Sequence, residues 1–189
     1  RRDRHAPVRR GVRLAVDVGS VRVGVARCDP DGMLAVPECT LARAADSDVP
    51  ATDIDQLARL VEEYQAVEVL IGLPLTLAGA EGPAAAAARG YAEAVARRVA
   101  PVGVRLVDER LSTVTAARSM RDVGRKQRRS RPVIDQAAAV VILQAALDAE
   151  RATGRPPGQP VASAAVAGQG VRGDDAGRSG AQRAEAPPS

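Results

Sequence analysis

The stretch LAVDVGSVRVGVA, residues 14–26, decides the fold of this chain. Two valine-rich apolar runs are separated by a short turn, and the first run ends in an acid, Asp17, two residues before Gly19. Runs of this length and composition are typical of β-strands. We therefore expect strands over 13–20 and 21–29, with a carboxylate at the tip of the first strand and bare backbone beside it.

The pattern on the C-terminal side of this pair predicts a mixed α/β fold. The predicted elements are a third strand over 34–43, a helix from Ile54 to Tyr64, a buried strand over 67–75, an alanine-rich helix over 83–100, a strand over 104–111, a helix over 113–123 and a last helix from Pro132 that is apolar nearly all round over 133–147. Short links make the first three strands an antiparallel meander, and β/α units follow it. We expect one five-stranded mixed sheet flanked by helices.

Composition divides the chain into three segments. Residues 1–11 are basic and are expected to be a disordered arm, residues 12–154 form one folded domain, and residues 155–189 are rich in Gly, Pro, Ala, Ser and Arg and are expected to be a disordered tail. No apolar run is long enough to span a membrane, and no apolar stretch follows the basic N-terminus as in a signal peptide. We expect a soluble, cytoplasmic protein without a membrane partner.

The scarce residue types limit the chemistry. The only histidine, His5, lies in the arm, which excludes histidine general bases, Ser-His-Asp triads and ordinary zinc sites. Two cysteines, Cys28 and Cys39, make no disulfide framework; we expect reduced thiols, with a regulatory bond as the alternative. Chemistry in this chain must therefore be done by carboxylates, together with a hard metal ion.

Positive charge is concentrated in one segment. The formal net charge is only +4, but GRKQRRSR at 124–131 holds Arg125, Lys126, Arg128, Arg129 and Arg131. Such density favours a polyanionic partner, and the alternative is a solvated loop without a partner. The chain has no Phe or Trp and two tyrosines, so binding should rest on phosphate contacts and on nucleic-acid shape rather than on base stacking.

Three acidic positions could meet at one edge of the predicted sheet. Asp17 ends the first strand, Asp108 and Glu109 end the strand over 104–111, and Asp135 stands in the first turn of the last helix. Sites in such sheets gather at the carboxyl ends of strands. Three carboxylates in one place are tolerable when Mg²⁺ or Mn²⁺ lies between them, and a pair of such ions can activate water against a phosphodiester.

Each of these residues also has a purely structural interpretation. Asp17 could cap the following turn, Asp135 could be favoured by the helix dipole, and either Asp108 or Glu109 could pair with Arg110. Adjacent strand residues face opposite sides, so at most one of that pair faces the ions. On the functional interpretation, Gly19 lets a phosphate backbone approach Asp17, and Arg22 contacts a phosphate oxygen.

Four segments together resemble the YqgF/RuvX family of Holliday-junction-resolvase-like proteins, also described as pre-16S rRNA nucleases. They are DVGSVRVGVA at 17–26, IGLPLTLAGAEGP at 71–83, VDERLST at 107–113 and IDQAAAVVIL at 134–143, and the resemblance covers roughly 12–150. It implies an RNase H-like fold with Asp17, Glu109 and Asp135 as catalytic, metal-binding acids. The family often carries an acid where this chain has Ala78, so no ligand is expected there.

The remaining expected contacts are with the substrate. Gly72 would leave room beside the ions, and Ser112 and Thr113 would cap a helix or meet a phosphate; the expected substrate-binding residues are Gly19, Arg22, Gly72, Arg110, Ser112, Thr113, Arg125, Lys126, Arg128 and Arg129.

The resemblance implies a hydrolase of the nuclease class, a monomer or homodimer that matures the 5′ end of pre-16S rRNA. The alternatives are a resolvase of branched DNA and a non-catalytic nucleic-acid-binding assembly factor. An actin-like or sugar-kinase ATPase would need two such lobes, and this chain is long enough for one.

Overall fold

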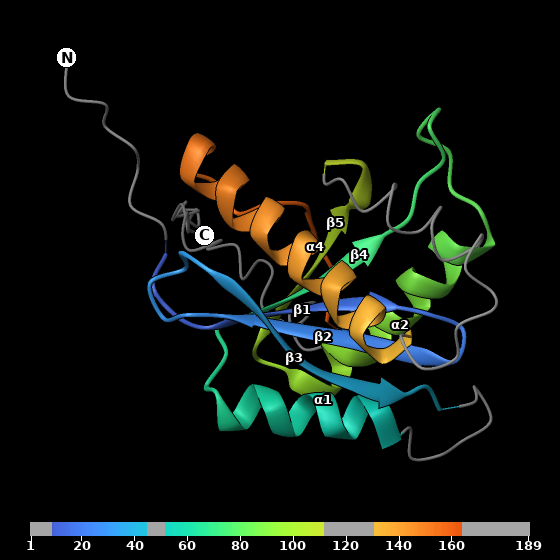
Figure 1. Ribbon diagram of the computed structural model, residues 1–189, viewed down its shortest axis with the longest axis horizontal. Helices are drawn as coiled ribbons and strands as arrows, with labels where there is room; N and C mark the ends of the chain where they lie inside the picture. The colour runs from blue at the N-terminus through green and yellow to red at the C-terminus, as the bar shows by residue number, and fades with distance from the viewer. Residues whose placement is uncertain (1–8, 45–51, 112–130, 164–189) are drawn as a thin grey trace, which may run out of the picture.

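The computed structural model describes residues 9–44, 52–111 and 131–163, and a mixed β-sheet lies at its centre (Figure 1). Its strands are β1 (Arg13–Val18), β2 (Arg22–Cys28), β3 (Ala35–Ala42), β4 (Glu68–Leu73), β5 (Gly103–Asp108) and β6 (Gln159–Pro160). They lie in the order β3-β2-β1-β4-β5-β6. The pairs β1–β2, β2–β3 and β5–β6 are antiparallel, whereas β1–β4 and β4–β5 are parallel.

This topology confirms the predicted α/β class, with its meander of three antiparallel strands and the β/α units that follow. The described part of the chain has one strand more than expected, because β6 joins the edge beside β5. The first strand is also shorter than predicted. It ends at Val18 because the amide of Gly19 donates a hydrogen bond to the carbonyl of Arg22, 2.9 Å away, which closes the turn into β2.

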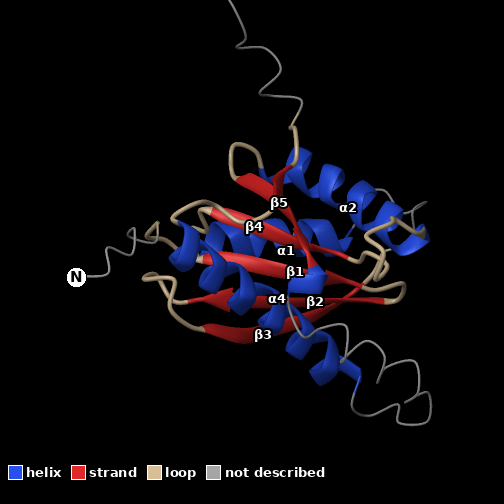
Figure 2. Cartoon of the chain, turned by 90° about the horizontal axis from the view of Figure 1, so that it is seen from above, coloured by secondary structure: helices blue, strands red, loops and turns tan. Residues whose placement is uncertain are grey.

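Helices cover both faces of the sheet (Figure 2). The long helix α4 (Arg131–Thr153) packs on β1, β2 and β3 on one face, and α1 (Thr52–Glu63) and α2 (Pro83–Val99) pack on the other. A single 3₁₀ turn, η1 (Glu109–Leu111), follows β5. The helix predicted over 113–123, and the basic segment as far as residue 130, lie outside the described residues.

The two faces have different cores. Between the sheet and α1 and α2, the buried side chains are mostly branched, with Leu14, Val16, Val69, Ile71 and Leu57 among the fully buried ones. On the α4 face many are alanines, and the buried set is Ala15, Ala26, Cys28, Ala35, Leu70, Val107, Ala138, Ala139, Ile142, Leu143, Ala146 and Leu147. Small residues on both sides let α4 approach the strands closely, so the prediction that the last helix is buried is confirmed.

The C-terminal segment does not become a free tail at residue 155, and the sequence-based boundary is wrong there. Pro157 is buried, and the guanidinium of Arg105 on β5 donates to the carbonyls of Pro157 and Gly158 at 2.6 and 2.8 Å. The amide of Val161 donates to Val104 at 2.8 Å. The open edge of β5 offers backbone groups that need partners, and a polar segment can supply them without any hydrophobic signal in its sequence.

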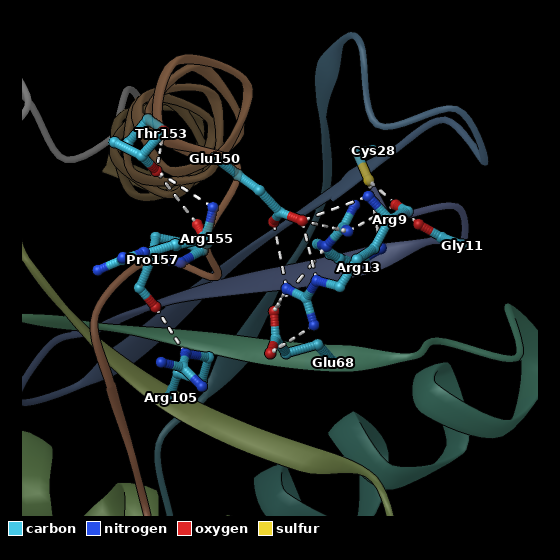
Figure 3. Close-up of polar contacts among 11 residues, drawn as sticks. Arg9, Gly11, Arg13, Cys28, Glu68, Arg105, Glu150, Thr153, Arg155 and Pro157 are labelled. Carbon is cyan, nitrogen blue, oxygen red and sulfur yellow. Dashed lines mark hydrogen bonds and ion pairs between the residues drawn. The ribbon is translucent and has the colours of Figure 1, made fainter. Parts of the chain in front are cut away.

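The end of the predicted N-terminal arm is also anchored, by a cluster of buried charges (Figure 3). Arg9 bonds Glu150 on α4 at 2.8 Å and Glu68 on β4 at 2.9 Å, and the fully buried Arg13 on β1 bonds Glu150 at 3.3 Å. Burial alone would raise the pKa of Glu150, but the hydrogen bond from Arg9 and the charge of Arg13 hold that pKa below its usual value. Arg9 therefore belongs to the folded domain.

The two cysteines are both free thiols on opposite faces of the sheet. Cys28 is buried on the α4 face, where burial raises its pKa, and Cys39 packs against the core on the α1–α2 face. A bond between them within one chain would have to cross the sheet, so the structure excludes it. Among the helices that the structure describes, none is both long and apolar enough to cross a membrane.

Candidate active site

Asp17 lies on the α4 face at the carboxyl end of β1, with only 1% of its surface exposed. It shares this face with Ala15 because side chains alternate along a strand, and Ala15 packs under α4. Asp17 stands opposite Gly24 on β2. Extending the parallel β1–β4 register by one residue from the pair Val16 and Ile71 places Gly72 on its other side. Asp17 is therefore flanked by two glycines.

Gly24 brings the start of α4 to Asp17. A Cβ atom at Gly24 would stand 2.1 Å from the carbonyl oxygen of Asp135, so only a glycine lets the helix lie this close to β2. The neighbouring Gln136 donates to Thr40 on β3 at 3.1 Å, and Thr40 stands opposite Gly24 in the sheet. Residues 135 and 136 thus lie across the row of the sheet that contains Asp17.

Gly72 brings Glu109 to the other side of the same row. A Cβ atom at Gly72 would stand 2.5 Å from Oε1 of Glu109 and 2.7 Å from Cδ1 of Ile142, so the bare backbone makes room for the carboxylate under α4. Glu109 is 4% exposed although it follows the end of β5. The bare backbone of Gly72 therefore makes room for the Glu109 carboxylate, and the expectation that Gly72 leaves room beside the ions stays a prediction.

Asp108, the other acid considered at this position, is paired with Arg110. Its carboxylate accepts a hydrogen bond from the amide of Arg110 at 2.9 Å and pairs with the Arg110 guanidinium at 2.6 Å. The bond from Arg110 holds the pKa of Asp108 below its usual value. Of the two alternatives left open by the sequence, Asp108 takes the ion pair with Arg110, and Glu109 takes the buried place beside Gly72.

The three acids approach one row of the sheet, but their side chains do not form a preformed metal cluster. Across residues 9–44, 52–111 and 131–163, no group of three or more Asp, Glu, His or Cys side chains is arranged to hold an ion. Asp17, Glu109 and Asp135 each take part in other polar interactions. The donor set nevertheless fits Mg²⁺ or Mn²⁺, because both ions prefer carboxylate oxygens.

The turn that follows Asp17 is held by a residue that the sequence did not point to. Arg43, just beyond β3, donates from its guanidinium to the carbonyl of Gly19 at 3.0 Å and from its amide to Val21 at 2.9 Å. Its guanidinium also lies 5.1 Å from the ring centroid of the buried Tyr91 on α2. Nothing in the sequence near Arg43 marks this contact, whereas Gly24, a glycine inside a strand, is a recognised sign of close approach.

The expected substrate-binding residues are only partly described. Gly19 forms the turn beside Asp17, and a Cβ atom there would stand 2.6 Å from the carbonyl of Arg22. Arg22 begins β2 and is partly exposed, and Arg110 is paired with Asp108. Ser112, Thr113, Arg125, Lys126, Arg128 and Arg129 lie outside the described residues. Ala78, where the family often has an acid, is exposed in the connection after β4.

Curated relatives resemble this chain over most of its length. A protein of Streptomyces coelicolor named "Putative pre-16S rRNA nuclease" is 56% identical over 154 residues, which cover 82% of this chain and 90% of the relative. Relatives with the same name from Thermobifida fusca and Rhodococcus erythropolis are 55% and 53% identical, covering 82% and 84% of this chain and 98% and 89% of their own lengths.

Among solved structures, Thermus thermophilus RuvC in complex with a Holliday junction substrate aligns with a TM-score of 0.48 at 15% identity, over 80% of this chain and 99% of that one. The sequence model of the family described as RuvX, Holliday junction resolvase, matches residues 11–149. That match covers most of the chain and includes Asp17, Glu109 and Asp135. The chain belongs to the RuvX family.

Proposed function

We propose that this protein is a metal-dependent endonuclease that hydrolyses phosphodiester bonds in structured nucleic acid. The observation that carries the proposal is the pair of glycines beside Asp17. Gly24 admits the first turns of α4 with Asp135, and Gly72 admits the carboxylate of Glu109. A glycine thus lies on each side of a buried acid, each one makes room for another acid-bearing segment, and a side chain at either position would clash with that segment.

In this proposal Asp17, Glu109 and Asp135 would hold Mg²⁺ or Mn²⁺, which would activate a water molecule and neutralise charge that develops on the leaving oxygen. The turn at Gly19 leaves the backbone beside Asp17 bare, so that a phosphate of the substrate can approach. Arg43 keeps that turn in place through the carbonyl of Gly19. The basic segment at 124–131 contributes positive charge for neighbouring phosphates, and Arg110, whose charge is offset by Asp108, offers guanidinium donors to them.

We propose pre-16S rRNA, processed at its 5′ end in the cytoplasm, as the substrate. The support is the name shared by relatives that are 53–56% identical to this chain. The second candidate is branched DNA, and the description of the RuvX family model favours it. The two candidate substrates require different oligomeric states of the protein. Symmetric resolution of a junction needs two active sites related by a two-fold axis, and hence a dimer, whereas one site suffices to trim a single RNA strand.

The test uses one preparation on two substrates. Wild type and Asp17→Asn are incubated with a pre-16S rRNA fragment and with a four-way DNA junction, in Mg²⁺, in Mn²⁺ and in chelator, and the mass of the protein in solution is measured under the same conditions. We expect metal-dependent cleavage of the RNA by wild type and none by Asp17→Asn. Cleavage of the junction alone, by a dimer, would favour the second candidate. Tight binding without cleavage in any metal would identify an assembly factor and overturn the nuclease.

A further inference from the structure

The end of α4 that carries Asp135, which we call the acid end, rests on small side chains. α4 lies over β1, β2 and β3 (Figure 2), and the first buried side chains that follow Asp135 along the helix are Ala138 and Ala139. Larger buried side chains begin with Ile142 and Leu143. Large side chains that interdigitate with their neighbours fix the position of a helix, whereas alanines leave shallow ridges. Apolar packing therefore does little to fix the helix from Asp135 to Ala139.

The peptide that follows Asp135 lies over bare backbone of the sheet. A Cβ atom at Gly24 would stand 2.1 Å from the carbonyl oxygen of Asp135 and 3.0 Å from the amide nitrogen of Gln136. The glycine creates the space for this close approach, but a missing side chain supplies no directional contact. The space at Gly24 thus does not determine how the helix is rotated about its axis.

A hydrogen bond beside this contact supplies the direction. Nε2 of Gln136 donates to Oγ1 of Thr40 at 3.1 Å, and Thr40 stands opposite Gly24 in the β2–β3 pair. We call this hydrogen bond the latch. It joins the helix to β3 at the residue next to Asp135, and both of its side chains are only partly buried. Because it satisfies no backbone group, the latch is not needed to complete the hydrogen bonds of the sheet or of the helix.

A second glutamine joins α4 to β3 in a different way. Gln144 accepts a hydrogen bond from the amide of Ala35 at 3.0 Å and donates one to the carbonyl of Met33 at 3.2 Å. Because it pairs with backbone groups at the start of β3, this contact serves the fold itself. The eight residues from Gln136 to Gln144 correspond to about 12 Å along the helix, so Gln144 lies far from the acid end.

We propose that Gln136 and Thr40 are positioning residues, and that the latch sets the rotation of α4 at which Asp135 meets the metal ion. This inference rests on the proposed function and names residues that act on the same site through Asp135. Side-chain ends lie about 5–6 Å from a helix axis, so a rotation of about 10° moves the Asp135 carboxylate by about 1 Å. A displacement of that size is enough to impair a catalytic constellation.

The test changes the two glutamines in the same way. Gln136→Met and Gln144→Met each remove one amide and keep an unbranched side chain of similar length. We would measure Mn²⁺ binding by calorimetry without nucleic acid, hydrogen exchange of α4 by mass spectrometry, and cleavage of the pre-rRNA fragment. We expect Gln136→Met to raise the Mn²⁺ dissociation constant about tenfold, as loss of a group that orients a metal ligand commonly does. It should also speed exchange at the acid end and lower kcat, with little change in KM or in the melting temperature.

Gln144→Met should have the converse effects. It should lower the melting temperature and speed exchange in the half of α4 beyond the acid end, because the amide of Ala35 loses its acceptor, and it should leave the Mn²⁺ affinity unchanged. The other side of the latch is tested in the same assays. Thr40→Val, which removes the hydroxyl, should match Gln136→Met, and Thr40→Ser, which keeps the hydroxyl, should match wild type.

The outcomes separate the latch from the proposed function. If wild type binds Mn²⁺ and cleaves, but Gln136→Met and Thr40→Val bind the ion as tightly as Gln144→Met does, the latch positions nothing and the inference is wrong. The inference is also wrong if the loss of Mn²⁺ affinity follows the loss of melting temperature across all the variants, because the latch would then be a structural contact. A wild type that neither binds Mn²⁺ nor cleaves would reject the proposed function, and the positioning role with it.

Discussion

Replacing Gly24 by alanine should show whether the position of α4 controls the activity of the proposed site. The added Cβ would stand 2.1 Å from the carbonyl oxygen and 2.4 Å from the carbonyl carbon of Asp135. Because ordinary contacts begin near 3.5 Å, the strand or the helix must move by about 1.4 Å. Both obstructing atoms are backbone, so rotation of a side chain cannot relieve the clash. We expect Gly24→Ala to lower the free energy of unfolding by about 1–3 kcal/mol, as other overpacked cores do.

The same movement carries Asp135 away from Asp17. Cleavage by the folded protein should therefore also fall, because displacements of about 1 Å in a catalytic constellation commonly cost about a hundredfold in rate. The assay combines urea unfolding with cleavage of the pre-rRNA fragment at a temperature at which both proteins remain folded. A metal titration is included, since weaker ion binding should raise the Mn²⁺ concentration needed for half-maximal rate.

The matched control is Gly90→Ala on α2, where an added Cβ meets nothing within 4 Å. Alanine inside a helix should stabilise the protein by about 0.5–1 kcal/mol and leave cleavage unchanged. If Gly24→Ala is destabilised as expected but cleaves with an unaltered rate and metal midpoint, then the position of α4 does not control the site. Asp135 would then have to be removed from the proposed metal ligands.

Three further predictions concern the rest of the chain. Glu150→Gln should destabilise the protein by about 3 kcal/mol in urea unfolding at neutral pH, because it removes the closer of the two carboxylates that pair with the buried Arg13, at 3.3 Å against 3.9 Å for Glu68; no loss would show that Glu68 suffices. Since the folded-state pKa of Glu150 is lowered, its stabilising contribution is complete above the usual value of 4.5 and is lost as the pH falls through the lowered value, so wild type and Glu150→Gln should converge in acid. A chain ending at Ser163 should melt like the full protein, whereas one ending at Gly154 should melt lower because it loses β6, Pro157 and the contacts of Arg105; equal melting of the two would contradict the packing seen here. Changing Arg125, Lys126, Arg128, Arg129 and Arg131 to Gln should reduce the slope of log affinity against log salt by about one per lost phosphate contact, and an unchanged slope would mean that the segment points away from the nucleic acid.

Local patterns determined most of the elements. The valine-rich runs around Asp17, the helical spacing from Ile54 and the apolar last helix predicted β1, β2, α1 and α4 within a few residues of their observed bounds. These predictions succeed because strands and helices each place apolar residues at a characteristic spacing along the sequence. The order of the elements then restricted the topology to a meander followed by β/α units, and the quoted motifs pointed to the three acids.

Tertiary packing decided what lies next to what. The sequence allowed either Asp108 or Glu109 to face the site, and only the packing of α4 and the bare backbone of Gly72 set Glu109 under the helix and left Asp108 to Arg110. The hydrogen bond from Arg43 to Gly19 and the packing of residues 155–163 on β5 join segments that are far apart in sequence. Neither contact is marked by a local sequence pattern. The physical reason is the same in each case. The tertiary fold brings partners within about 3 Å of backbone donors and acceptors and of buried charges, and it brings atoms into the space that a glycine leaves. The periodicity of apolar residues shows only which side of a helix or strand is buried.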